Sequence, residues 1–220
     1  MNFKRLLSYI LPIKIYQTAS KINQNLEVTW NNGQLVLDSK NTNFSFGSLE
    51  RVMRIGLNTL GKEKITTYQS VLVLGVGGGS VIKLLQDEIQ FGGKIIGIEL
   101  DPKVIEIANQ YFGLDKRKNI EINLKDAFEF VKNTTTTYDL IVIDIFQDKI
   151  MPDFLFSEPF IFNLNRILSK KGSVLFNSIV TLSVDFERNA AYNRLVAAHF
   201  SSVQRLSNVE GDNELFILRK

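Results

Sequence analysis

The feature that most constrains the fold is an apolar run that leads directly into a cluster of glycines, at residues 71–80. A strand buried in a parallel sheet is apolar along its length, and glycines permit a tight turn into the next helix. Apolar residues then recur with helical spacing at Val81, Ile82, Leu85 and Ile89. The segment therefore predicts a strand, a turn and a helix, with a backbone that can approach a nucleotide-like ligand closely.

The spacing of the glycines narrows the class of ligand. Gly75, Gly77 and Gly79 alternate with other residues, and Ser80 stands where a dinucleotide fingerprint needs its last glycine. A nicotinamide-dependent oxidoreductase is therefore the least favoured of the enzyme classes considered. The turn on its own does not specify a ligand, and the acidic residues that follow it narrow the class further.

The second predicted strand, residues 94–99, ends in Glu99. An acid at this place can accept hydrogen bonds from both hydroxyls of a ribose held over the first turn. Packing explains such an acid poorly, so we expect Glu99 to contact a ligand. Asp101 is better explained as the N-cap of the next helix, with Pro102 at its first position.

Two further predicted strands, residues 120–124 and 138–144, also end beside an acid. Asp126 could cap the following helix, or it could accept a hydrogen bond from an adenine amino group beside the Ala127 N–H. Asp144 could act as a general base, or it could accept N–H bonds from the loop after its strand. Both pairs of interpretations stay open. Because the carboxyl ends of parallel strands meet at one edge, the series predicts an adenosine-bearing ligand without a pyrophosphate.

Composition limits the other classes of function. The chain has no cysteine, which excludes disulfides, thiol catalysis and cysteine-ligated metal and fits a reducing cytoplasm. The single histidine, His199, leaves no histidine metal cluster and no Ser-His-Asp triad, and we expect it to be structural or solvated. The net charge is only +3, and the basic residues 116–118 are not interleaved with aromatics, so no nucleic-acid partner is expected. No segment predicts a membrane span.

The chain divides into two predicted parts. Residues 1–58 form a small β-rich unit with a hairpin turn at Asn32-Gly33, and residues 59–220 form the core. Residues 1–16 are expected to form an ordered arm that packs on the body or on a second subunit. The core should end in a helix at 186–199 and an antiparallel hairpin of strands near 202–206 and 214–218.

At this point the pattern is recognisable. The segments 71–80, 96–111, 123–130 and 138–148, followed by 151–177, resemble the class I S-adenosylmethionine-dependent methyltransferase superfamily and, within it, the spermidine synthase-like group. Residues 25–38 look like the hairpins that precede the core in aminopropyltransferases. The resemblance implies an α/β, Rossmann-like, doubly wound sheet of seven mostly parallel strands with a C-terminal antiparallel hairpin, plus the small N-terminal hairpin unit.

The resemblance also implies a set of site residues. The glycine turn would line the methionine part of the cofactor, Glu99 would hold the ribose, Asp126 and Ala127 the adenine, and Asp144 would face the transferred group. The implied cofactor is S-adenosylmethionine or its decarboxylated form, bound without a metal. The residues predicted to bind it are Gly75, Gly77, Gly79, Glu99, Leu100, Asp126, Ala127 and Asp144. Asp144 is also the predicted catalytic residue.

Three departures from the aminopropyltransferase pattern matter. Gly78 stands where an acid usually lies in the glycine turn, Gln147 replaces a second acid after the fourth strand, and residues 44–47 lack the expected tyrosine. Because binding a diamine requires several carboxylates, polyamine synthesis is disfavoured. Phe146 and Gln147 would border the acceptor pocket.

The leading hypothesis is a cytoplasmic, methyltransferase-like enzyme that acts on a small, unidentified acceptor. The alternatives are an aminopropyltransferase that uses the decarboxylated cofactor and a non-catalytic homologue that binds a nucleoside. A homodimer is compatible with each of these three hypotheses.

Overall fold

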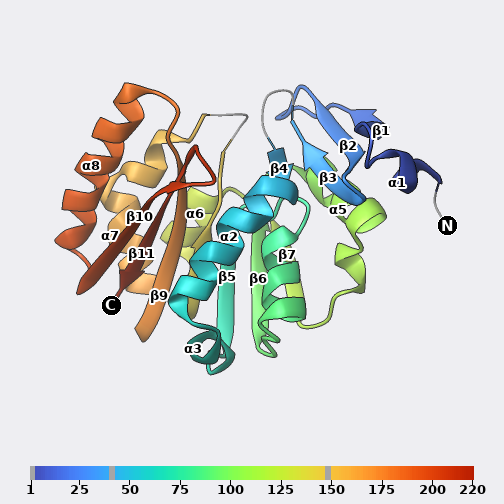
Figure 1. Cartoon of the computed structure of the whole chain (residues 1–220). Coiled ribbons are helices and arrows are strands. Elements are labelled where there is room, and N and C mark those ends of the chain that lie inside the picture. Colours follow the sequence, from blue (N-terminus) through green and yellow to red (C-terminus); the bar gives the residue numbers. More distant parts are fainter. Residues whose placement is uncertain (1–2, 40–42, 147–149) are drawn as a thin grey trace.

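The computed structural model describes residues 3–39, 43–146 and 150–220. Within these residues a large seven-stranded sheet with helices on both faces stands beside a smaller four-stranded sheet (Figure 1). The order across the large sheet is β10-β11-β9-β8-β5-β6-β7. Its strands are β5 (Ser70–Leu74), β6 (Lys94–Glu99), β7 (Ile120–Leu124), β8 (Tyr138–Ile143), β9 (Leu168–Ile179), β10 (Ser202–Val209) and β11 (Asn213–Arg219).

The strand directions match the predicted doubly wound fold. β5 pairs in parallel with β6 and with β8, and the parallel arrangement continues to β7 on one side and to β9 on the other. β11 is antiparallel to both β9 and β10, which forms the predicted C-terminal hairpin. The chain order therefore reverses at β5, and ligands bind in open α/β sheets at the carboxyl ends beside such a point.

Alternate residues of the strands enter two separate hydrophobic cores. Val71 and Val73 pack with α2 (Gly47–Leu60), with α4 (Ser80–Lys83) and its π-helical continuation η1 (Leu84–Glu88), and with α5 (Pro102–Phe112). Leu72 and Leu74 face the other side, where α6 (Ala127–Asn133), α7 (Glu158–Ile167) and α8 (Ser183–Ala197) lie. Because both faces are covered, β5 is apolar without interruption from Val71 to Leu74, as the sequence indicated.

The small sheet has the order β1-β2-β3-β4. Its strands are β1 (Ile13–Thr18), β2 (Leu26–Asn31), β3 (Gln34–Asp38) and β4 (Asn43–Ser45). Asn32 and Gly33 form the predicted two-residue turn, both with positive φ, which suits the twist of a hairpin. The small sheet packs through Leu26, Val28 and Leu37 against Val104 and Ile107 of α5. This contact positions it above the carboxyl edge of the large sheet (Figure 1).

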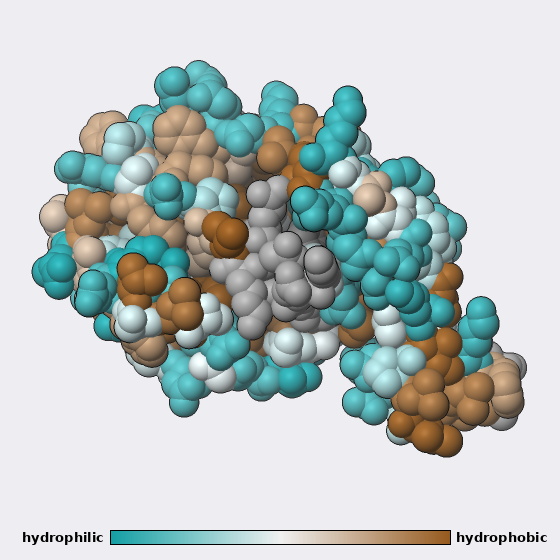
Figure 2. Space-filling model, turned by 90° about the horizontal axis from the view of Figure 1, so that it is seen from above, coloured by the Kyte–Doolittle hydropathy of each residue, from teal (hydrophilic) through white to brown (hydrophobic). Residues whose placement is uncertain are grey.

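The N-terminal arm packs on its own unit. The short helix α1 (Phe3–Leu7) places Arg5 so that its Nε donates to the carbonyl of Gly33, and the Ser8 hydroxyl accepts from the Gly33 N–H. The arm leaves an apolar outer side, which Figure 2 shows as the brown projection at lower right. The exposed apolar residues of this arm are Phe3, Leu6, Tyr9, Ile10 and Leu11.

The boundaries differ from the predictions in detail. α8 begins at Ser183, three residues before the predicted start, and β10 continues to Val209. α2 packs on the large sheet although the sequence grouped it with the small unit, and the division at residue 58 stays a prediction. In the part of the chain that the structure describes, no helix has the length and apolarity needed to cross a membrane.

Candidate functional site

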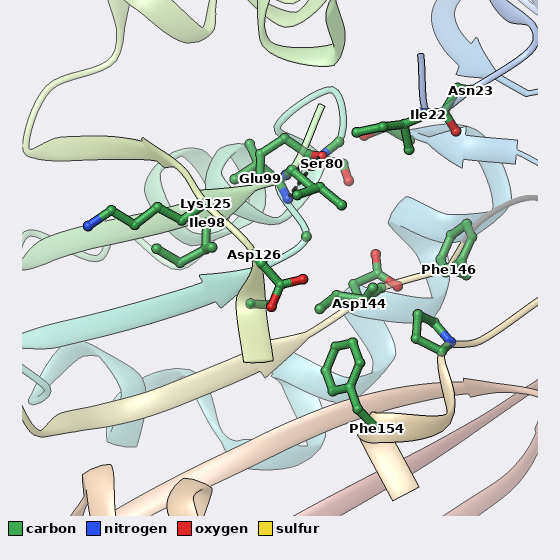
Figure 3. Close-up of a pocket in the computed structure, with 18 residues that line it drawn as sticks. Ile22, Asn23, Ser80, Ile98, Glu99, Lys125, Asp126, Asp144, Phe146 and Phe154 are labelled. Atoms are coloured by element: carbon green, nitrogen blue, oxygen red, sulfur yellow. Dashed lines mark hydrogen bonds between the residues drawn. The ribbon is translucent and has the colours of Figure 1, made fainter. Parts of the chain in front are cut away.

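A pocket with a volume of about 270 Å³ opens at the carboxyl ends of β5, β6, β7 and β8 (Figure 3). This is slightly below the usual range for small-molecule sites, which is about 300–1,000 Å³. Its wall contains seven of the eight predicted cofactor residues, namely Gly75, Gly77, Glu99, Leu100, Asp126, Ala127 and Asp144. The structure therefore brings seven of the predicted residues together in one wall, and their binding to a cofactor stays a prediction.

Glycine in the turn is required first by the protein's own packing. Gly75 has a φ of 86°, and a Cβ there would lie 2.2 Å from the carbonyl oxygen of Asp144. The turn after β5 thus touches the end of β8, so that the two strand ends form one wall. Gly79 is the predicted residue outside the pocket wall: it has a φ of 90° and stands at the N-cap position of α4.

Glu99 is buried, with 8% of its surface exposed, and its carboxylate is surrounded by backbone donors. One oxygen accepts from the N–H groups of Val76 and Gly77, each at 3.2 Å. The other accepts from Leu100 at 2.9 Å and from Asp101 at 3.0 Å. Burial raises the pKa of the Glu99 carboxyl, and the four N–H donors oppose that rise. The acid joins the turn after β5 to the turn after β6.

Asp101 is the N-cap that the sequence predicted, and it also holds the small sheet's loop in place. Its Oδ1 accepts from the Lys103 N–H at 2.9 Å at the start of α5. Its Oδ2 accepts from the Ser20 hydroxyl and from the Asn23 side-chain amide. Because Asn23 and its neighbour Ile22 line the pocket, this contact links Asp101 to the part of the wall that the loop before β2 supplies.

Asp126 also caps a helix, which confirms one of its two interpretations. Its Oδ1 accepts from the Glu129 N–H at 2.9 Å at the start of α6. The side chain still lines the pocket, as Asp144 does (Figure 3). Capping and ligand binding are therefore compatible, and contact of Asp126 and Ala127 with adenine remains a prediction.

Asp144 has a different environment from Glu99. Its carboxyl is half-buried at the pocket wall, and one oxygen accepts from the Asn177 side-chain amide at 3.0 Å. Burial raises the pKa of Asp144 to about 7, which the Asn177 hydrogen bond opposes only in part. A carboxyl with a pKa near neutrality can take up or release a proton at physiological pH, as a general base must.

Sequence reasoning missed the other residues of the wall. They come from the loop before β2, from β4, from the turn after β5 and the start of α4, from β6, and from the segments after β7 and β8, and they are Ile22, Asn23, Ser45, Val76, Ser80, Ile98, Lys125, Ile145, Pro152 and Phe154. Phe146 borders the pocket as predicted, whereas Gln147 lies outside the described residues. Asn177, the partner of Asp144, was also missed, because only strand pairing places β9 beside β8.

The described residues include no group of three or more histidine, aspartate and glutamate side chains that could hold a metal ion. The acidic side chains of the pocket wall, in the same described part of the chain, are Glu99, Asp126 and Asp144, and the basic one is Lys125.

Sequence relatives of this chain are named as two kinds of transferase. The polyamine aminopropyltransferase of Vibrio vulnificus is 26% identical over 136 residues, which are 60% of this chain and 45% of that protein. The eEF1A lysine and N-terminal methyltransferase homolog of Drosophila pseudoobscura pseudoobscura is 25% identical over 130 residues, 55% of this chain and 19% of that protein. The chain thus spans less than half the length of these relatives.

Solved structures support the fold. A spermidine synthase in complex with the transition state analogue AdoDATO superposes with a TM-score of 0.76 at 18% identity, covering 94% of this chain and 74% of that one. Human methyltransferase-like protein 13 in complex with SAH gives 0.67 at 21% identity, covering 79% and 82%. Residues 50–193 match the family model of the spermine/spermidine synthase domain. The chain therefore belongs to the spermine/spermidine synthase domain family, on the class I S-adenosylmethionine-dependent methyltransferase fold.

Proposed function

We propose that the protein is an S-adenosylmethionine-dependent methyltransferase that acts on a small acceptor. The observation that carries the proposal is the pocket wall itself. It joins the glycine turn, Glu99, Asp126 and Asp144 at the carboxyl ends of neighbouring strands, where an adenosine-bearing cofactor would lie.

The charge of the pocket favours methyl over aminopropyl transfer. Decarboxylated S-adenosylmethionine carries one more positive charge than S-adenosylmethionine, and a polyamine acceptor adds further charges. Glu99 already accepts four backbone hydrogen bonds, and one oxygen of Asp126 caps α6. Because the pKa of Asp144 is about 7, its negative charge is also incomplete at neutral pH. Such a wall offers little free negative charge to replace the hydration of a polycation.

The structure gives a reason for the absence of an acid in the glycine turn. A Cβ at Gly78 would lie 3.0 Å from both the Ser45 Cβ and the Phe46 ring, so the small sheet fills the space that a side chain would need. A carboxylate at this position would require the β4–α2 junction to move.

In the proposed reaction the acceptor's nucleophile attacks the methyl carbon of the sulfonium. The carbon–sulfur bond breaks, its electron pair stays on sulfur as a thioether, and the acceptor's proton passes to Asp144. The main contribution of the protein is alignment, which supplies up to about 7–11 kcal/mol in favourable cases. The position of Asp144 at the pocket wall and its pKa near neutrality support this role.

Calorimetry with S-adenosylmethionine, its decarboxylated form and methylthioadenosine tests the proposal. We expect S-adenosylmethionine to bind more tightly than the decarboxylated form, and a screen of metabolites with labelled cofactor should then find methyl transfer. Asp144→Asn should abolish that transfer while cofactor binding persists, and the exposed Asp115→Asn serves as the control. If none of the three compounds binds, both transferase activities are rejected.

The second candidate is an aminopropyltransferase, which the family match and the relative from Vibrio vulnificus favour. An aminopropyltransferase should show the opposite order of cofactor affinities in the same calorimetric experiment. Tighter binding of the decarboxylated cofactor, together with aminopropyl transfer to a diamine, would replace our proposal. Binding of nucleosides without any transfer would instead support the non-catalytic alternative.

A further inference from the structure

One polar group of the pocket wall has no partner in the described structure. Ser45, the last residue of β4, is 1% exposed, and its hydroxyl has no hydrogen-bond partner among the described residues. Buried hydroxyls are nearly always paired, because an unpaired one has lost its hydration without compensation. Since Ser45 lines the pocket, a bound ligand can supply the missing partner.

The backbone next to Ser45 is strained in a way that fixes its position. Phe46 has a φ of 70°, which is unfavourable for a residue with a bulky side chain. Its ring stacks on Phe112 of α5, with 4.6 Å between ring centroids, and Lys83 lies over it at 5.4 Å. Strain of this kind persists where the surroundings impose it, and it occurs often at ligand sites. Two elements of the core therefore hold the end of β4 against the glycine turn.

Ser45 also stands at a defined place on that turn. Its hydroxyl would lie 3.1 Å from a Cβ at Gly78, so it occupies the space next to Gly78. By the resemblance described above, this turn lines the amino-acid end of the cofactor. The small sheet thus places a neutral hydroxyl beside that end, where a side chain on Gly78 would be excluded.

We propose that the Ser45 hydroxyl donates a hydrogen bond to the carboxylate of the amino-acid end of S-adenosylmethionine, and so selects this cofactor over its decarboxylated form. The proposal rests on the proposed function, because it presumes that the pocket binds this cofactor. A hydroxyl suits a carboxylate, to which it makes a short, charge-assisted bond. The decarboxylated form keeps the ammonium but has lost the carboxylate, so it offers the Ser45 hydroxyl no such acceptor.

Calorimetry of the full chain with Ser45→Ala tests the assignment. The variant should bind S-adenosylmethionine about 10-fold more weakly, as expected for one charge-assisted hydrogen bond. It should bind methylthioadenosine, which lacks the amino-acid end, and the decarboxylated cofactor as the unaltered protein does. Ser48→Ala, an exposed serine three residues along the chain, should change none of these affinities.

Unchanged affinity of Ser45→Ala for S-adenosylmethionine would overturn the assignment, and so would an equal loss for methylthioadenosine. Either result leaves the proposed function standing, because the unaltered protein would still bind the cofactor. If the unaltered protein binds none of the three compounds, the proposed function fails, and the role of Ser45 fails with it.

Discussion

Glu99 and Asp144 stand at the carboxyl ends of β6 and β8, the two strands that flank β5, and both line the pocket, yet their hydrogen-bond partners differ. Glu99 accepts four backbone N–H bonds from the turns after β5 and β6. Asp144 accepts one side-chain hydrogen bond, from Asn177, and its pKa is raised to about 7. The comparison teaches that an acid at a strand end can have two roles. Its carboxylate can accept several backbone N–H bonds and join two turns, or it can keep acceptor sites and a proton site open to a ligand. The number of hydrogen-bond donors around the carboxylate distinguishes the two cases.

The comparison also changes what Glu99 is expected to do. The sequence predicted that it holds both ribose hydroxyls, so that Glu99→Ala would weaken cofactor binding by about 1–3 kcal/mol. A carboxylate offers about four acceptor sites, and the backbone already uses four. A ribose would therefore have to share these sites or displace a donor. Ribose binding by Glu99 stays a prediction, and its role in joining the turns is what the structure shows.

The largest expected effect comes from Glu99→Gln, which keeps the size of the side chain. Its NH₂ group would face two backbone N–H groups that now have an acceptor, so the free energy of unfolding should fall by about 2–4 kcal/mol. Urea unfolding measures this. The control is Glu121→Gln on β7, an exposed acid that pairs with Lys94 and should change stability by about 0.5 kcal/mol or less. Equal losses in both variants would contradict the structural role.

An intermediate effect is expected from Asp101→Ala. The change removes the N-cap of α5 and the two side-chain bonds to Ser20 and Asn23, so we expect a loss of about 1–3 kcal/mol in thermal or urea unfolding. Asp126→Ala, which removes a cap alone, is the matched comparison and should lose about 1 kcal/mol. If the two variants lose the same amount, the link to the small sheet contributes nothing to stability.

The smallest expected effect is the pH dependence that Asp144 introduces. Its pKa in the folded protein, about 7, is higher than the ordinary value of 3.8, so its contribution to stability is complete at low pH and is lost as pH rises through 7. Stability should therefore decrease by about 1 kcal/mol between pH 6 and pH 8, and Asp144→Asn should remove this slope. The control Asp115→Asn should retain it. A slope that persists in Asp144→Asn would assign the titration to another group.

Local patterns in the sequence predicted most of the fold and much of the site. The apolar run before Gly75 indicated a strand with both faces covered, and Asp101-Pro102 indicated the start of a helix; the structure confirms both. The seven strands and the final hairpin were expected from the resemblance and are present in the described residues. The prediction failed for Ser45 and Asn177, because tertiary contacts bring both to the site: the end of β4 packs on the glycine turn at Gly78, and β9 pairs with β8.

The sequence by itself determined where acids and glycines fall relative to strand ends, because apolar periodicity and turn chemistry are local properties. Only the tertiary structure decided which acid has its acceptor sites occupied by backbone N–H donors and which has not. Four backbone N–H groups converge on Glu99 because two turns meet there, whereas the edge at Asp144 offers a single amide from β9. The pKa of a carboxyl depends on its burial and on the donors that surround it in space, and neither can be obtained from the residue's position in the chain.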